Sequence, residues 1–202
     1  MRSNTLIAGQ TKLPANRARA VNEQYYFPDN TVLINFAVVD SIELLVAYLS
    51  GRARVTQAVA AEIKKSIERV PHLREFDIEQ HCGRPIELNT EADNRAVLQM
   101  RKRFASRNDP PTKHLGESET LHVISSREQY ATSRFLTEDR DAYRVAESMG
   151  VLCSNTMEVF QDLVARGEVS SSEAFALLQS IADGPFDRTL LSVPTRHQDL
   201  LV

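Results

Sequence analysis

The chain has 202 residues, a length that suits one hydrophobic core and argues against a large multidomain enzyme. With 42% hydrophobic and 25% charged residues, the sequence is too apolar for a disordered chain. The formal net charge of -3 neither suggests nor excludes nucleic-acid binding, because a local basic face would be hidden in that sum. The two cysteines, Cys82 and Cys153, provide no disulfide framework and no zinc motif, which suits a reducing compartment.

No membrane segment and no secretory signal are expected from this sequence. The most apolar stretch, 31–51, is interrupted by Asp40 and Glu43, whereas a membrane span requires about 20 apolar residues. The N-terminal region contains no apolar block of signal-peptide length. We therefore expect a cytoplasmic protein with no membrane partner.

One domain with two extensions is expected. Residues 1–23 are polar and mixed, without a sustained period, and are interpreted as an N-terminal arm. The domain is expected over 24–183, where no internal linker divides the chain. Gly184-Pro185 ends the last helical pattern, so 184–202 is interpreted as a C-terminal tail.

Short strands and helices alternate along the first half of the expected domain. Tyr25-Tyr26-Phe27 predicts a strand that ends at Pro28, which places Asp29 directly beyond its carboxyl end. Three helices and one brief strand are expected to follow: 31–36 as a helix, a helix from the capping box Asp40-Ser41-Ile42-Glu43 to Tyr48, a strand at Arg54-Val55, and a helix from Thr56 to about Arg69.

The second half repeats this alternation after a stretch, 72–95, whose pattern is hard to interpret. His81-Cys82 in that stretch lacks the second ligand pair that a tetrahedral zinc site needs. The expected elements are helices over 91–107 and 116–126, a strand over 132–137, a helix to Met149, a strand over 151–153, and helices over 155–165 and 170–182. Strands separated by helices predict an α/β protein, a three-layer sandwich with a mainly parallel central sheet.

Five acidic residues are set apart by their places in this pattern. Asp29 follows the first strand, Glu62 lies beside the apolar stripe of a helix, and Glu117 stands in the first turn of another. Asp139 and Asp141 follow a later strand. Functional groups gather beyond the carboxyl ends of parallel strands, so these carboxylates can meet in one cleft. Clustered carboxylates repel one another, and Mg²⁺ or Mn²⁺ would relieve that repulsion and support phosphodiester hydrolysis.

Four blocks of sequence occur in a suggestive order. They are Asp29-Asn30-Thr31-Val32-Leu33-Ile34-Asn35-Phe36, Val55-Thr56-Gln57-Ala58-Val59-Ala60-Ala61-Glu62-Ile63, Leu115-Gly116-Glu117-Ser118-Glu119 and Phe135-Leu136-Thr137-Glu138-Asp139-Arg140-Asp141-Ala142. In order and spacing they resemble the PIN domain, a metal-dependent ribonuclease fold found in many bacterial and archaeal toxins of toxin–antitoxin pairs. Each block alone is a weak signal, and the ordered set carries the resemblance.

The resemblance implies a metal centre and a function. It assigns roles as follows: Asp29, Glu62, Glu117 and Asp139 as acids that bind Mg²⁺ or Mn²⁺, Asp141 as an auxiliary ligand, and Thr137 as a residue that orients a ligand. It implies a toxin-type endoribonuclease that cleaves RNA, is neutralised by an antitoxin protein, and forms a homodimer. The order Asn30-Thr31 is reversed relative to the commoner family pattern, and Pro28 is unusual beside the first acid.

Simpler interpretations of single residues stay open. Asp29 and Asp139 can each be no more than a helix N-cap, and Glu62 can be a solvated residue that pairs with Lys65. His114 lies near Glu117, yet a histidine in a loop after prolines is more often incidental than a substrate contact.

Two other functions also stay open. One is a catalytically silent PIN-like module that acts only through protein contacts. The other is a Mg²⁺-dependent phosphatase with Asp29 as its nucleophile, which would form a covalent aspartyl phosphate.

Overall fold

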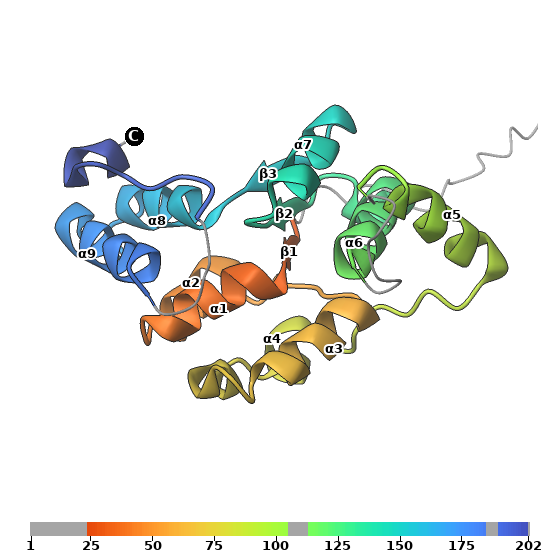
Figure 1. The fold of residues 1–202 in the computed structure, drawn as a ribbon, viewed down its shortest axis with the longest axis horizontal. Coiled ribbons are helices and arrows are strands. Elements are labelled where there is room, and N and C mark those ends of the chain that lie inside the picture. The colour runs from red at the N-terminus through yellow and green to blue at the C-terminus, as the bar shows by residue number, and fades with distance from the viewer. Residues whose placement is uncertain (1–23, 105–112, 185–189, 202) are drawn as a thin grey trace, which may run out of the picture.

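A three-stranded parallel sheet lies at the centre of the protein. The computed structural model describes residues 24–104, 113–184 and 190–201, so the predicted arm 1–23 lies outside the described residues. The strands stand in the order β1 (Tyr26–Pro28), β2 (Arg134–Leu136), β3 (Leu152–Ser154) (Figure 1). Phe27 pairs with Phe135, and Phe135 pairs with Cys153. All three strands therefore present their carboxyl ends at the same edge.

Helices cover both faces of this sheet. They are α1 (Asn30–Val38), α2 (Ile42–Leu49), α3 (Gln57–Ser66), α4 (Ile78–Cys82), α5 (Glu91–Arg101), α6 (Leu115–Ser126), α7 (Arg140–Ser148), α8 (Thr156–Ala165) and α9 (Ser171–Ala182). Three short 3-10 helices accompany them: η1 (Pro71–Glu75), η2 (Glu128–Tyr130) and η3 (His197–Leu200).

Alternate strand residues divide the hydrophobic core into two parts. Tyr26 and Leu136 pack with α1, α2, α3, α8 and α9 on one face of the sheet. Phe27 and Phe135 pack with α6 and α7 on the other face. Successive side chains of a strand point to opposite faces, which is why neighbouring residues serve different cores. The predicted three-layer α/β sandwich with a parallel sheet is confirmed.

The predicted capping box at Asp40-Ser41-Ile42-Glu43 is wrong. Ser41 is the N-cap of α2, but its side chain makes no capping hydrogen bond. The Ser41 hydroxyl donates instead to the carbonyl oxygen of Val39, in a turn where Asp40 has a positive φ of 53°. The hydroxyl is thus engaged by the preceding turn, which sequence spacing does not reveal.

The predicted strand at Arg54-Val55 is also wrong. Only isolated bridges form here, between Ala53 and Tyr26 and between Thr56 and Ile86. The two bridges have different partner segments, so no continuous ladder can develop between them. The following helix, α3, ends at Ser66 and not at Arg69.

Other helix boundaries agree with the sequence pattern. The capping box of Asn155 and Glu158 at the start of α8 is confirmed in both directions. The Ser170 hydroxyl accepts a hydrogen bond from the backbone N–H of Glu173 at the start of α9, as predicted. The helix predicted over 91–107 ends at Arg101 in α5, and 105–107 lie outside the described residues.

The described part of the C-terminal region packs on the domain. Leu190 and Leu200 are buried, and η3 packs against α8 and α9 (Figure 1). Gln161 of α8 donates to the carbonyl oxygen of Asp199 at 3.0 Å. Over the described ranges, no helix is long and apolar enough to cross a membrane.

Candidate metal centre

The carboxyl ends of two neighbouring strands position Asp29 and Asp139. Asp29 follows β1 directly, and its backbone N–H donates to the carbonyl oxygen of Leu136 at the end of β2. Asp139 follows β2 after a short loop and is the N-cap of α7. Because β1 and β2 are adjacent and parallel, both aspartates lie at the same edge of the sheet.

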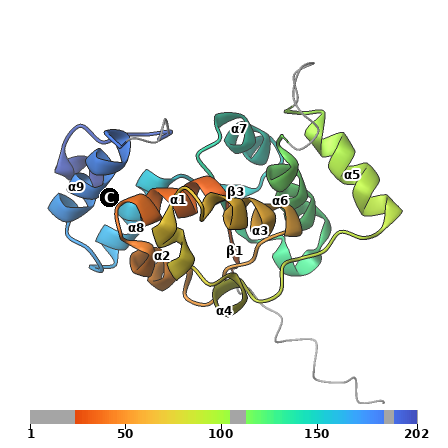
Figure 2. The ribbon, with the colours of Figure 1, turned by 60° about the horizontal axis from the view of Figure 1, so that its bottom comes forward.

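Two packed helices bring Glu62 and Glu117 toward the same place. Helix α6, which carries Glu117, contacts α3, which carries Glu62 (Figure 2). Gly116 permits this close approach. A β-carbon at Gly116 would lie 3.0 Å from Val59 Cγ2 and 3.2 Å from Glu62 Oε1. The missing side chain of Gly116 therefore leaves room for the carboxylate of Glu62.

Hydrogen bonds to two threonines orient the aspartates. The Thr31 hydroxyl donates to Asp29 Oδ2 at 2.6 Å, and Thr137 Oγ1 accepts from the backbone N–H of Asp139 at 3.1 Å. Thr31 stands where the family pattern commonly has another residue, so the reversed order puts a hydroxyl donor beside Asp29. Thr137, expected to orient a ligand, holds the backbone of Asp139. The contribution of Thr31 was not anticipated from the sequence.

The capping interpretation holds for one aspartate and fails for the other. Asp139 Oδ1 accepts from the backbone N–H of Ala142 at 2.8 Å, which is a helix N-cap. Its second oxygen, Oδ2, points toward His114 Nδ1 at 3.9 Å. Asp29 is the N-cap residue of α1 but makes no capping hydrogen bond with its side chain. One oxygen of Asp139 and the buried carboxylate of Asp29 are thus not used for helix capping.

Burial and repulsion between neighbouring charges raise the pKa of Asp29, Glu62 and Glu117. Burial is the main cause of the raised pKa of Asp29, and repulsion by Asp139 adds to it. Burial, followed by the charges of Asp29 and Glu119, raises the pKa of Glu62 to about 7. Burial, with repulsion from Asp29, Glu62 and Asp139, raises the pKa of Glu117 to about 8. The pKa of each of these three carboxylates is therefore raised in part by the negative charge of another acid in the cluster.

No lysine or arginine in the described part of the chain forms an ion pair with this cluster. None of the ion pairs between described residues joins a lysine or arginine to Asp29, Glu62, Glu117 or Asp139. Lys65, the expected partner of Glu62, acts only as a more distant charge that lowers its pKa. Oxygen donors that repel one another and lack a cationic partner fit a divalent cation such as Mg²⁺ or Mn²⁺.

A histidine joins the carboxylates. Single ligand atoms of His114, Glu117 and Asp139 all lie within 4.8 Å of one another. His114 Nδ1 is 3.5 Å from Glu117 Oε1, and the side chain is only 7% exposed. His114 therefore lies within the acidic cluster, although its place in a loop after prolines favours an incidental role. The only signal in the sequence is its place three residues before Glu117, which puts both on one side of a helix start.

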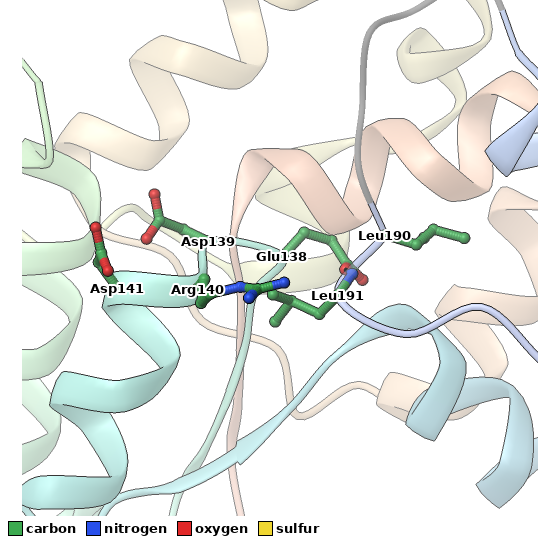
Figure 3. A pocket seen from close by; sticks show the side chains of 6 residues that line it. All are labelled: Glu138, Asp139, Arg140, Asp141, Leu190 and Leu191. Atoms are coloured by element: carbon green, nitrogen blue, oxygen red, sulfur yellow. Dashed lines mark hydrogen bonds between the residues drawn. The ribbon is translucent and has the colours of Figure 1, made fainter.

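Asp141 stands apart from this group. It lines a cavity of about 260 Å³ whose walls are Glu138, Asp139, Arg140, Asp141, Leu190 and Leu191. Figure 3 shows Asp139 and Asp141 on one side of the loop and Glu138 turned toward the C-terminal residues. Asp141 is exposed and is not among the closely spaced ligand atoms. It is placed to meet a ligand of the cavity and not to close the cluster.

Two neighbouring acids have structural partners. Glu119 Oε2 accepts from the backbone N–H of Ala58 at 3.0 Å, which caps the first turn of α3. Glu138 accepts from the backbone N–H groups of Thr156 and Leu191 with its two oxygens. Both carboxylates are thus used to hold helix and chain segments together.

Comparison with known families gives one match, which covers most of the chain. A family model described as a PIN domain matches residues 27–186, a range that begins in β1 and extends past α9. It therefore includes all three strands and all four clustered carboxylates. No curated protein and no solved structure matches the chain. PIN domains are generally nucleases. On this match over most of its length, the chain belongs to the PIN-domain family.

Proposed function

We propose that this protein is a metal-dependent endoribonuclease that hydrolyses phosphodiester bonds of RNA. The observation that carries the proposal is the convergence of Asp29, Glu62, Glu117 and Asp139, where burial and neighbouring negative charges raise the pKa of Asp29, Glu62 and Glu117. Buried carboxylates that repel one another destabilise the folded protein unless a cation binds between them. A nuclease is the activity that this arrangement supports best in a PIN domain.

The same residues would hold Mg²⁺ or Mn²⁺. Carboxylate oxygens are the ligands that both ions prefer, and such sites keep open positions for a phosphate oxygen. When bound, the cation supplies Lewis-acid stabilisation of the charge that develops at the phosphoryl group and lowers the pKa of water. Asp29 and Asp139 keep their orientation through Thr31 and Thr137. Glu62 would bind the cation or orient a water molecule, and hydrolysis by that water requires no covalent intermediate.

Cationic side chains beside the centre support a nucleic-acid substrate. A second cavity, of about 450 Å³, shares Arg140 and Leu191 with the cavity at Asp139. It is lined by Arg140, Tyr143, Arg144, Glu147, Asn155, Glu158, Leu191 and Ser192. Arg140 and Arg144 are exposed one turn apart on α7. Arginines in such positions can contact the phosphates on either side of the cleaved bond.

The test is cleavage of a mixed single-stranded RNA pool with Mn²⁺, with Mg²⁺ and with a chelator. We expect metal-dependent cleavage by the wild type and its loss in Asp29→Asn and in Asp139→Asn, since each removes a ligand charge with little change in volume. Asp183→Asn, an exposed acid at the end of α9, is the matched control and should cleave like the wild type. Equal cleavage by Asp29→Asn and the wild type would point to a contaminating nuclease.

The alternatives give different outcomes in the same experiment. A folded protein that binds metal but cuts no RNA would favour the silent interaction module. A covalent phosphate on Asp29 after incubation with a phosphomonoester would favour the phosphatase.

The family resemblance further suggests a toxin that is neutralised by an antitoxin protein and forms a homodimer. For such a toxin, growth inhibition on expression should disappear with Asp29→Asn. Size-exclusion chromatography with light scattering would test the dimer.

A further inference from the structure

His114 is held in a conformation that its residue type disfavours. It is the N-cap residue of α6 with φ of 59° and ψ of 21°, in the left-handed region. Residues with a β-carbon rarely adopt this region, and they do so where the surrounding structure imposes it. The carbonyl oxygen of His114 accepts hydrogen bonds from both the backbone N–H and the hydroxyl of Ser118. The imidazole stacks on Phe104, with 5.4 Å between ring centroids.

This conformation directs the imidazole at the carboxylates. His114 Nδ1 lies 3.5 Å from Glu117 Oε1 and 3.9 Å from Asp139 Oδ2. Two ligands that each bind one cation at about 2.0–2.2 Å are separated by at most about 4.4 Å. Both measured distances fall below that limit. His114 Nδ1 is therefore close enough to each of the two carboxylate oxygens to bind the same ion, and the three ligand atoms all lie within 4.8 Å of one another.

His122 of α6 shows the shorter distance that is typical of a histidine hydrogen-bonded directly to a carboxylate. His122 Nε2 lies 2.8 Å from Asp93 Oδ1, a normal hydrogen-bond distance. The distances from His114 Nδ1 to Glu117 and Asp139 are both longer than such a bond. His114 Nδ1 thus lies farther from its carboxylates than a direct hydrogen bond requires, whereas His122 and Asp93 are at hydrogen-bond distance.

We propose that His114 Nδ1 is a nitrogen ligand of the metal in this centre and makes the centre prefer Mn²⁺ over Mg²⁺; the inference rests on the metal centre of the proposed function. Mg²⁺ is bound by oxygen ligands, whereas imidazole nitrogen suits transition metals. Glutamate and histidine three residues apart, in the order Glu-x-x-His on a helix, bind manganese and iron in four-helix proteins. Here the order is reversed: His114 is the N-cap residue of α6 and Glu117 lies in its first turn.

The first test detects nitrogen bound to Mn²⁺ directly. Electron spin-echo envelope modulation of the Mn²⁺-loaded full chain should show the coupling of an imidazole ¹⁴N nucleus. The coupling should disappear in His114→Asn, because asparagine tolerates the left-handed conformation and supplies no imidazole. It should persist in His122→Asn. It should also persist in His72→Asn, which removes the histidine of an exposed cluster with Asp40 and Glu75.

The second test compares the two metals by isothermal titration calorimetry. His114→Asn should lower Mn²⁺ affinity about 10- to 100-fold, the range seen when the environment of a metal ligand is disturbed. Mg²⁺ affinity should change less, so the ratio of the two affinities falls. His122→Asn should leave that ratio at the wild-type value. An unchanged ratio in His114→Asn would overturn the proposal.

Failure of this inference is distinguishable from failure of the proposed function. Wild-type protein that binds Mn²⁺ without ¹⁴N coupling overturns the role of His114 even if His114→Asn does not fold. Coupling that is lost only in His72→Asn overturns it as well, because the exposed cluster is then the nitrogen source. Neither measurement involves RNA. A protein that shows the coupling of His114 but cuts no RNA loses only the nuclease function.

Discussion

At the scale of single residues, the site is defined by acids that lie close together, and no lysine or arginine of the described residues forms an ion pair with Asp29, Glu62, Glu117 or Asp139. Glu117 is the clearest case, since burial and the charges of Asp29, Glu62 and Asp139 raise its pKa to about 8. Its ordinary pKa is 4.5. The folded metal-free protein therefore holds a proton on Glu117 at pH values where the unfolded chain has released it.

This difference predicts how stability depends on pH. Between about pH 4.5 and 8, the folded state binds more protons than the unfolded state, so the free energy of unfolding decreases as pH rises. Thermal unfolding in chelator should show a falling Tm from pH 5 to pH 8.5. Glu117→Gln should flatten this slope and raise Tm at pH 8 by about 2–4 °C per kcal/mol regained. Asp183→Asn, the exposed control, should keep the wild-type slope, and a wild-type slope in Glu117→Gln would contradict the argument.

At the scale of elements, the centre depends on how closely α6 packs against α3. Gly116 is the contact point, because a β-carbon there would lie 3.0 Å from Val59 and 3.2 Å from Glu62. These are tight distances, and a larger side chain would have to push the two helices apart. Such a displacement would separate Glu62 from Glu117.

Substitution of Gly116 should therefore reduce stability and metal binding together. Gly116→Val should lower the free energy of unfolding by about 1–3 kcal/mol, the usual cost of overpacking. It should also weaken Mn²⁺ binding measured by calorimetry. Ser125→Val, at an exposed position of the same helix, tests the effect of a β-branched residue alone and should cost less than about 0.5 kcal/mol. Equal losses in both variants would show that packing against α3 is not the cause.

At the scale of the whole molecule, residues beyond the family match contribute to the site. The match ends at residue 186, yet Leu190 and Leu191 line the cavity beside Asp139. Glu138 connects its own loop to α8 and to the C-terminal residues, since its carboxylate accepts backbone hydrogen bonds from Thr156 and from Leu191. The C-terminal residues are thereby attached to the loop that carries Asp139 (Figure 3).

Removal of this carboxylate should loosen the C-terminal segment, defined as 190–201. Glu138→Ala leaves two backbone N–H groups without their acceptor, which should cost about 1–3 kcal/mol. Hydrogen exchange should become faster at the Leu191 and Thr156 amides, and limited proteolysis should cut near the segment. Glu168→Ala, which removes only a partly exposed ion pair with Arg166, is the control. Unchanged exchange at Leu191 in Glu138→Ala would show that other contacts hold the segment.

Local sequence patterns predict most of the strands and helices and the positions of Asp29 and Asp139 at strand ends. Both follow from local hydrophobic periods and from residues such as Asn155 that cap helices. These signals depend on residues within one or two helical turns of each other. They can therefore be recognised in the sequence without knowledge of the rest of the fold. The parallel sheet followed because helices between strands leave few other topologies.

Which side chains meet, and what each one does, depends on contacts between segments that are far apart in the sequence. Asp139 caps α7 with one oxygen and directs the other at His114. No sequence pattern predicts that the two oxygens have different partners. The sequence does not predict that His114 faces the carboxylates, because its orientation depends on the contact with Phe104 and on a left-handed backbone conformation. Ala53 and Thr56 form separate bridges because distant segments pair with them. Local periodicity carries no information about contacts between segments far apart in the chain, and packing supplies it.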